Sequence, residues 1–95
     1  MEYAQKAYEI NPKSAVVLDT MGVILLNEGN TGRAVDLLTR SVELEPGNLD
    51  ARYHLSQALV QNGDKAAAQK MLQELLSESG NFSERKNAAA LLNSL

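Results

Sequence analysis

The sequence predicts an all-α fold in which about six helices pair and stack as an open solenoid. The first observation is a repeat, because Gly29 and Gly63 lie 34 residues apart, as do Pro12 and Pro46. A fixed period of this size is typical of stacked helix–turn–helix units. The second observation is that apolar residues between these turns recur three and four positions apart, as on one face of a helix. Further pairs at the same offset are Leu25 and Leu59, Asn30 and Asp64, Ala34 and Ala68, and Leu38 and Leu72.

The composition is typical of one small domain with an aliphatic core. The chain has 95 residues, of which 44% are apolar, with one Phe and no Trp. Its net charge of -3 argues against nucleic acid as a ligand, because a nucleic-acid groove needs a basic face. The absence of cysteine excludes disulfides and thiolate metal sites. The apolar runs of the chain, such as Val23–Leu26, are too short to cross a membrane.

The N-terminal segment, residues 1–12, is predicted to be the second helix of a truncated repeat. Ala4, Ala7 and Tyr8 form an apolar stripe, and Pro12 ends the helix. Because the first helix of this repeat is missing, we expect the chain to be a piece of a longer array. We also expect the uncovered apolar stripe to promote self-association at high concentration.

Two full repeats follow, residues 15–48 and residues 49–82, and each is predicted to hold two helices. Residues 83–95 are predicted to form a C-terminal capping helix seated by Phe82, so that the whole chain is a single domain. The helices expected in these three parts cover residues 15–27, 31–45, 49–61, 65–77 and 84–93.

Turn and capping residues fix where these helices begin and end. Ser14 and Asn48 are good N-caps for the first helix of each repeat, and Asn30 is expected to cap the helix that follows it. Gly29 and Gly63 are expected to supply the left-handed backbone that ends a helix.

Small residues mark the places where helices are expected to approach closely. Gly22 and Ser56 occupy the same position in the two repeats, and both are small. Ala34 is expected to let the two helices of the first repeat close against each other.

These residues resemble the tetratricopeptide repeat (TPR). The family's large aromatic residues are absent, since Leu18 and Arg52 stand at its Trp position and Leu25 and Leu59 at its Tyr position. The resemblance implies a right-handed superhelix of helix–turn–helix pairs. The residues that carry it are Leu18, Met21, Gly22, Leu25, Gly29, Asn30, Ala34, Leu38, Ser41 and Pro46, then Leu55, Ser56, Leu59, Gly63, Asp64, Ala68, Leu72 and Leu75.

A narrower resemblance covers the C-terminal half of the chain. Residues 51–59, 62–68, 75–85 and 90–92 are similar to the C-terminal end of the TPR lipoproteins found with bacterial exosortase (PEP-CTERM) protein-sorting systems. This resemblance implies an exported bacterial protein linked to exopolysaccharide production, in the periplasm or at the outer membrane, whose chain ends at Leu95. Without it, a cytoplasmic location stays open.

The sequence contains no constellation of residues that points to catalysis, a cofactor or a metal ion. His54 is the only histidine, so a two-histidine metal site is excluded, and we expect this residue to face solvent or the groove. Gly29–Gly32 lacks the lysine of a phosphate-binding loop. We therefore expect a non-catalytic module that binds a protein.

The TPR resemblance implies a concave groove, lined by the first helix of each pair, that holds a peptide. Tyr53 is expected to be its best anchor, because aromatic side chains dominate recognition energy. The family's clamp for acidic C-terminal peptides uses Lys, Asn and Arg, which this chain lacks at the matching positions, so that ligand is not expected. The groove candidates are Val16, Asp19, Val23, Leu26, Asn27, Asp50, Tyr53, Gln57, Val60 and Gln61.

Two alternatives stay open. Val23, Leu26 and Val60 could pack between neighbouring helices instead of contacting a ligand. The repeats could also serve only to cap and stiffen a longer array that binds its partners elsewhere.

Overall fold

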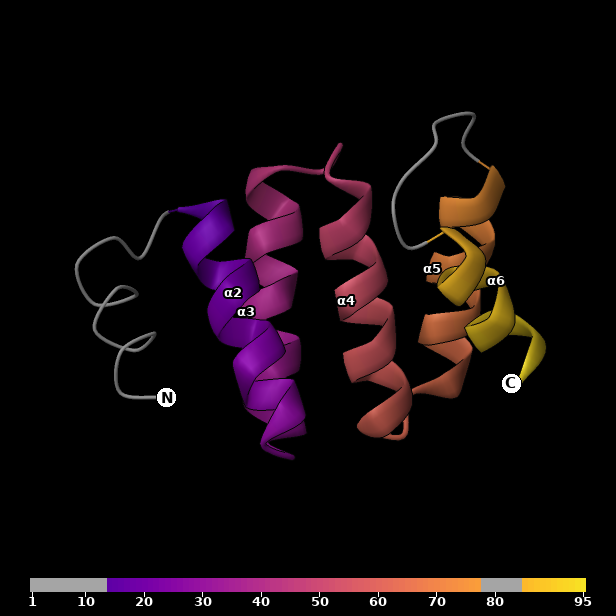
Figure 1. Cartoon of the computed structure of the whole chain (residues 1–95), viewed down its shortest axis with the longest axis horizontal. Coiled ribbons are helices and arrows are strands. Elements are labelled where there is room, and N and C mark those ends of the chain that lie inside the picture. The colour runs from indigo at the N-terminus through magenta and orange to yellow at the C-terminus, as the bar shows by residue number, and fades with distance from the viewer. Residues whose placement is uncertain (1–13, 78–84) are drawn as a thin grey trace.

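The computed structural model describes residues 14–77 and 85–95, which form five α-helices and no strand. Figure 1 shows them standing side by side in chain order, with α2 in front of α3 and α6 in front of α5. Each helix packs mainly against the next one in the sequence, which confirms the predicted all-α solenoid. The helices are α2 (Ala15–Asn27), α3 (Thr31–Leu44), α4 (Leu49–Gln61), α5 (Lys65–Ser77) and α6 (Arg85–Asn93).

The predicted helix bounds agree with the structure to within one residue. Helix α3 ends at Leu44, one residue earlier than expected. The helix expected at the N-terminus, the role of Phe82 and the predicted start of the last helix at Glu84 lie outside the described residues.

The expected turn glycines and two of the expected caps are confirmed. Gly29 and Gly63 have φ values of 84° and 90°, the left-handed backbone that favours glycine. The amide of Val17 donates to the Ser14 hydroxyl at 3.3 Å. The amide of Ala51 donates to the Asn48 side chain at 3.1 Å.

Asn30 occupies the predicted N-cap position of α3, but its side chain makes no capping hydrogen bond. The backbone amide of Asn30 donates to the carbonyl of Leu25 at 2.9 Å and closes the turn after α2. Its ψ of 68° also differs from the extended values of 119° at Ser14 and 99° at Asn48. Asn30 therefore completes the end of α2 and begins α3 through its backbone, without a side-chain cap.

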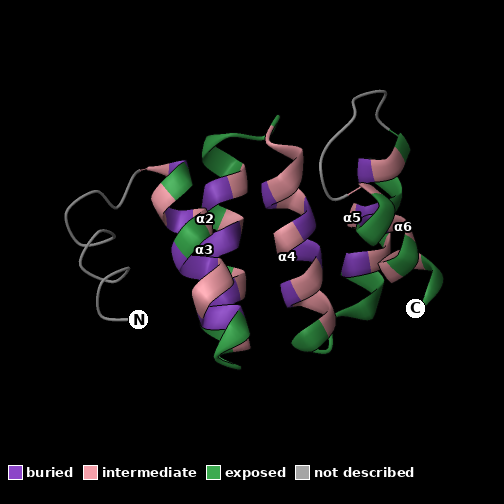
Figure 2. Ribbon diagram, viewed as in Figure 1, coloured by how far each residue is buried: buried purple, intermediate pink, exposed green. Residues whose placement is uncertain are grey.

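The core consists of two apolar clusters that meet at α4. Figure 2 shows buried residues on the sides of the helices that face their neighbours. The first cluster joins α2, α3 and α4 and contains Leu18, Met21, Leu25, Leu26, Ala34, Leu37, Leu38, Leu55 and Ala58. The second cluster joins α4, α5 and α6 and contains Tyr53, Leu72, Leu75 and Ala88.

Gly22 lies at a close contact between α2 and α3. A Cβ atom at this position would lie 2.5 Å from Cγ of Leu38 and 2.7 Å from its Cδ2. Leu38 is fully buried, so its side chain has little room to move. The structure therefore gives a steric reason for the small residue that the repeat pattern singled out.

We expect Gly22→Ala to lower the free energy of unfolding by about 1–2 kcal/mol, because overpacking outweighs the gain in helix propensity. Gly32→Ala is the matched control, because nothing lies within 4 Å of a Cβ there. The control should be neutral or stabilising. Urea unfolding of the two variants and the parent chain measures both effects, and equal stability of the two variants would contradict the steric assignment.

A buried hydrogen bond ties the end of α3 to the start of α2. The Ser41 hydroxyl donates to the carbonyl of Ala15 at 2.8 Å, and Ser41 is 1% exposed. Ser41 is one of the residues that carry the family resemblance, and the structure adds the partner that satisfies its buried hydroxyl.

Candidate peptide-binding surface

The first helices of the two full repeats each carry a stripe of residues that stay outside the apolar clusters. The stripes follow helical spacing and occupy equivalent positions, 34 residues apart. All of their residues are exposed or partly exposed. We call the two stripes together with Asp19 the inner surface. The stripes consist of Val16, Thr20, Val23 and Asn27 on α2, and of Asp50, His54, Gln57 and Gln61 on α4.

The inner surface contains a polar contact between the two repeats. Nδ1 of His54 lies 2.9 Å from Oδ1 of Asp19, and the two side chains are 23% and 21% exposed. A carboxylate can only accept, so the Nδ1–H of the imidazole donates. Apart from this pair, α2 and α4 have few contacts with each other. The pair therefore joins two helices that otherwise meet mainly through α3.

The sequence predicted neither this pairing nor a site role for Thr20, and His54 was expected only to face solvent or the groove. His54 is equivalent to Thr20, not to Asp19, when the repeats are superimposed in sequence. The contact therefore depends on how the helices sit in space and not on the repeat. The 34-residue register itself was the signal that could have placed Thr20 and His54 in the stripes.

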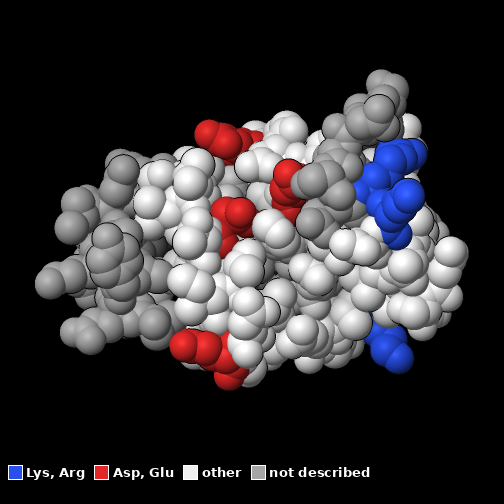
Figure 3. Space-filling model, in the orientation of Figure 1, with Lys and Arg blue, Asp and Glu red and all other residues white. Residues whose placement is uncertain are grey.

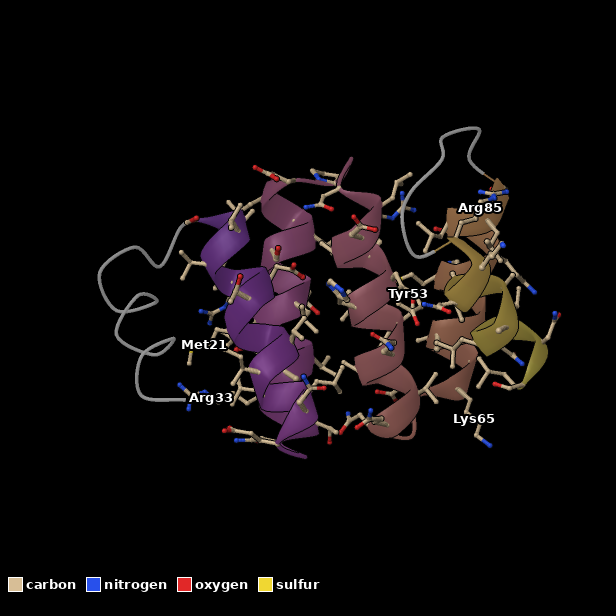
Figure 4. The ribbon with its side chains drawn as sticks, viewed as in Figure 1. Met21, Arg33, Tyr53, Lys65 and Arg85 are labelled. Atoms are coloured by element: carbon tan, nitrogen blue, oxygen red, sulfur yellow. The ribbon has the colours of Figure 1, made fainter. Side chains whose placement is uncertain are left out.

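Two of the predicted groove residues are buried, so we no longer assign them contact with a ligand. Leu26 is 6% exposed and belongs to the cluster of α2, α3 and α4, as the packing alternative allowed. Tyr53 is also 6% exposed and packs with Leu72, Leu75 and Ala88. Figure 4 shows its side chain pointing from α4 toward α5 and α6.

The burial of Tyr53 follows from the helix that comes after the second repeat. Tyr53 is equivalent to Asp19 in the first repeat, and Asp19 faces α4. The neighbour of α4 on the corresponding side is α6, whose Ala88 is fully buried and small enough to admit the ring. Tyr53 therefore becomes part of the core and is not available as an exposed anchor.

The remaining predicted groove residues stay accessible. Val16, Asn27 and Gln61 are exposed, while Asp19, Val23, Asp50, Gln57 and Val60 are partly buried.

A family model described as tetratricopeptide repeat matches residues 25–92, most of the chain. This chain belongs to the TPR family. The match confirms the family-level resemblance, and proteins built from TPR units are generally protein-interaction modules without catalytic activity. No protein with a curated description matches the chain.

Charge is unevenly distributed on the side of this TPR solenoid where α2 lies in front of α3. Figure 3 shows Asp and Glu side chains over α2, α3 and α4, and Lys and Arg side chains over α5 and α6. The inner surface contains the carboxylates of Asp19 and Asp50, and its two stripes contain no Lys or Arg. On this side, α2, α3 and α4 therefore present a surface that favours positive charge.

Metal binding and membrane insertion find no support in the part of the chain that the structure describes. Among residues 14–77 and 85–95, no three His, Asp or Glu side chains gather in a way that could hold a metal ion. None of the helices in these ranges is both long and apolar enough to span a bilayer.

We expect the contact between His54 and Asp19 to contribute about 0.5–1 kcal/mol to the free energy of unfolding, because the pair is partly exposed to solvent. A double-mutant cycle of Asp19→Ala and His54→Ala isolates this term from losses that each residue causes on its own. Urea unfolding of the four proteins gives the coupling energy. A coupling energy indistinguishable from zero would show that the contact does not hold the repeats together.

Proposed function

We propose that this chain is a non-catalytic part of a longer TPR array and binds a protein partner along its inner surface. The observation that carries the proposal is that two neighbouring first helices present equivalent stripes which their own core does not use. Val16, at 65% exposure, is one of only two large hydrophobic residues exposed in the described ranges. The other stripe residues are mostly polar and can donate or accept hydrogen bonds.

This mixture of groups fits a protein segment better than a small molecule. A small-molecule site is a concave, mostly apolar pocket with a few polar groups. The inner surface instead extends over two helices and alternates Val16 and Val23 with polar side chains. An extended or helical segment can contact such a surface at several points along its length.

Site-specific photo-crosslinking in the full-length protein tests this proposal. A benzophenone side chain at position 16 or 57 should form covalent adducts with one and the same partner. The matched controls are positions 43 and 70, which are exposed on α3 and α5, outside the inner surface. Adducts only from the control positions, or equally from all four, would contradict binding along the inner surface.

A second candidate function is that the repeats only cap a longer array. The observation in its favour is the polar or small character of the exposed residues of α6, which are Lys86, Asn87, Ala90 and Asn93. A polar outer face is what a terminal solenoid unit needs for solubility. In this case removal of residues 85–95 would lower the melting temperature, while the inner-surface positions would yield no adducts.

The narrower resemblance adds a cellular setting to the proposal. If it holds, the full-length protein is an exported bacterial lipoprotein that acts with an exosortase system in exopolysaccharide production. The test is metabolic labelling with a fatty acid in the native host. Incorporation at an upstream cysteine supports the setting, and an unlabelled protein in the cytoplasmic fraction contradicts it.

Self-association through residues 1–12 remains a prediction, because these residues lie outside the described ranges. Sedimentation at rising concentration measures it, and a strict monomer at millimolar concentration would contradict it.

A further inference from the structure

We propose that the inner surface selects a protein segment in which lysine or arginine lies close to an apolar side chain. This inference rests on the proposed function and adds the chemistry of the partner. The two stripes differ in character even though they are equivalent in the repeat. Val16 on α2 stands where Asp50 stands on α4, and Val23 stands where Gln57 does. One side of the surface is therefore apolar, and the other is acidic and polar.

The electrostatic part of the argument starts from Asp19 and Asp50. Both carboxylates are partly exposed and both already have a partner within the chain, while no Lys or Arg belongs to the inner surface. Asp19 accepts a hydrogen bond from His54 at 2.9 Å. Each carboxylate has about four acceptor positions, so an existing bond leaves capacity for a further, cationic donor. A glutamate at the same place in a partner would instead be repelled.

The apolar part of the argument comes from α2. Val16 is 65% exposed, and Val23 is partly exposed two turns further along the same stripe. Burial of such side chains by a partner is favourable, because it removes apolar surface from water. The apolar residues of the partner should therefore lie over α2.

The spacing of the helices sets the spacing within the partner. Packed helices lie about 8–10 Å apart, and an extended chain advances about 3.3 Å per residue. An extended segment that crosses from α2 to α4 should therefore place its basic residue about two to four positions from its apolar residue, at an even spacing, because only then do both side chains face the same side. The occupant that fits is a short extended protein segment that presents apolar and basic side chains in turn on one face.

Three synthetic peptides of about nine residues, long enough to cross both helices, provide the test. On the face that meets the inner surface they present valine and a variable residue in turn, and the variable residues are all lysine, all glutamine or all glutamate. Each is titrated into the ¹⁵N-labelled chain and followed by NMR. We expect the lysine peptide to bind most tightly and to shift the amides of residues 16–27 and 50–61. Its affinity should fall several-fold between about 0.05 M and about 0.5 M salt, because the charges are exposed to screening.

Two variants distinguish binding of the lysine peptide at Asp50 from nonspecific electrostatic attraction to the acidic chain. Asp50→Asn should weaken the lysine peptide about two- to fivefold, the range of an exposed ion pair, and leave the glutamine peptide unchanged. Asp64→Asn is the matched control, because Asp64 lies at the start of α5, next to the far end of α4. The control should bind all three peptides as the parent chain does.

Several outcomes would overturn the inference. Equal or tighter binding of the glutamate or glutamine peptide at these amides would refute the selection of basic residues, while the proposed function would stand. The absence of shifts at these amides with every peptide would refute the inference, and the crosslinking experiment would then decide the proposed function separately. Shifts of the same amides on simple dilution of the chain would identify a second copy as the occupant.

Discussion

Tyr53→Ala is expected to lower the free energy of unfolding by about 3 kcal/mol or more, the range for removing a buried aromatic ring. The ring is 6% exposed and fills the contact between α4, α5 and α6. A small repeat domain has only about 5–15 kcal/mol of stability, so the loss would be visible in urea unfolding of the isolated chain. The same variant would weaken partner binding only because the second cluster comes apart.

Two controls separate the core role of Tyr53 from a recognition role. Tyr53→Phe keeps the ring and should retain most of the stability. Gln57→Ala changes a partly exposed residue of the same helix and should cost less than about 0.5 kcal/mol, as surface substitutions do. If Tyr53→Ala unfolds like the parent chain but loses the partner, the burial assigned to the ring is wrong.

Leu38→Ala should also lower the free energy of unfolding, by about 2–5 kcal/mol, because it removes buried methyl groups and leaves a cavity. Leu38 is fully buried in the first cluster and is the residue that Gly22 contacts. The lost side chain would leave α2 and α3 without their central contact. Urea or thermal unfolding measures the change.

Leu44→Ala provides a control of the same residue type on the same helix. Leu44 is 48% exposed, so the substitution should cost about 0.5 kcal/mol or less. A similar loss from both leucines would show that burial does not decide their contribution. The double variant Gly22→Ala with Leu38→Ala adds a further test, because the removed leucine makes room for the new methyl group. Its cost should therefore be less than the two single costs added together.

The sequence was sufficient for the parts of this fold that depend on local chemistry. Helix bounds follow from apolar periodicity, from capping by Ser14 and Asn48, and from the left-handed turns at Gly29 and Gly63. These features act over a few residues, so a pattern in the chain contains them almost completely. The 34-residue period also predicts that neighbouring helix pairs stack, and it indicates the TPR family that the family model confirms.

The candidate site was only partly predictable, because its residues take their roles from helices distant in the sequence. Whether Tyr53 recognises a ligand or fills the core depends on α6, which covers it with Ala88. The contact between His54 and Asp19 joins positions that the repeat does not relate.

The sequence by itself determined the helices, their turns, their order and the family of this protein. Only the tertiary structure decided that Tyr53 and Leu26 are buried, that the side chain of Asn30 makes no capping hydrogen bond, and that His54 contacts Asp19. The physical reason is that a repeat fixes equivalent backbone positions, whereas the exposure and partners of a side chain depend on the particular helix packed against it.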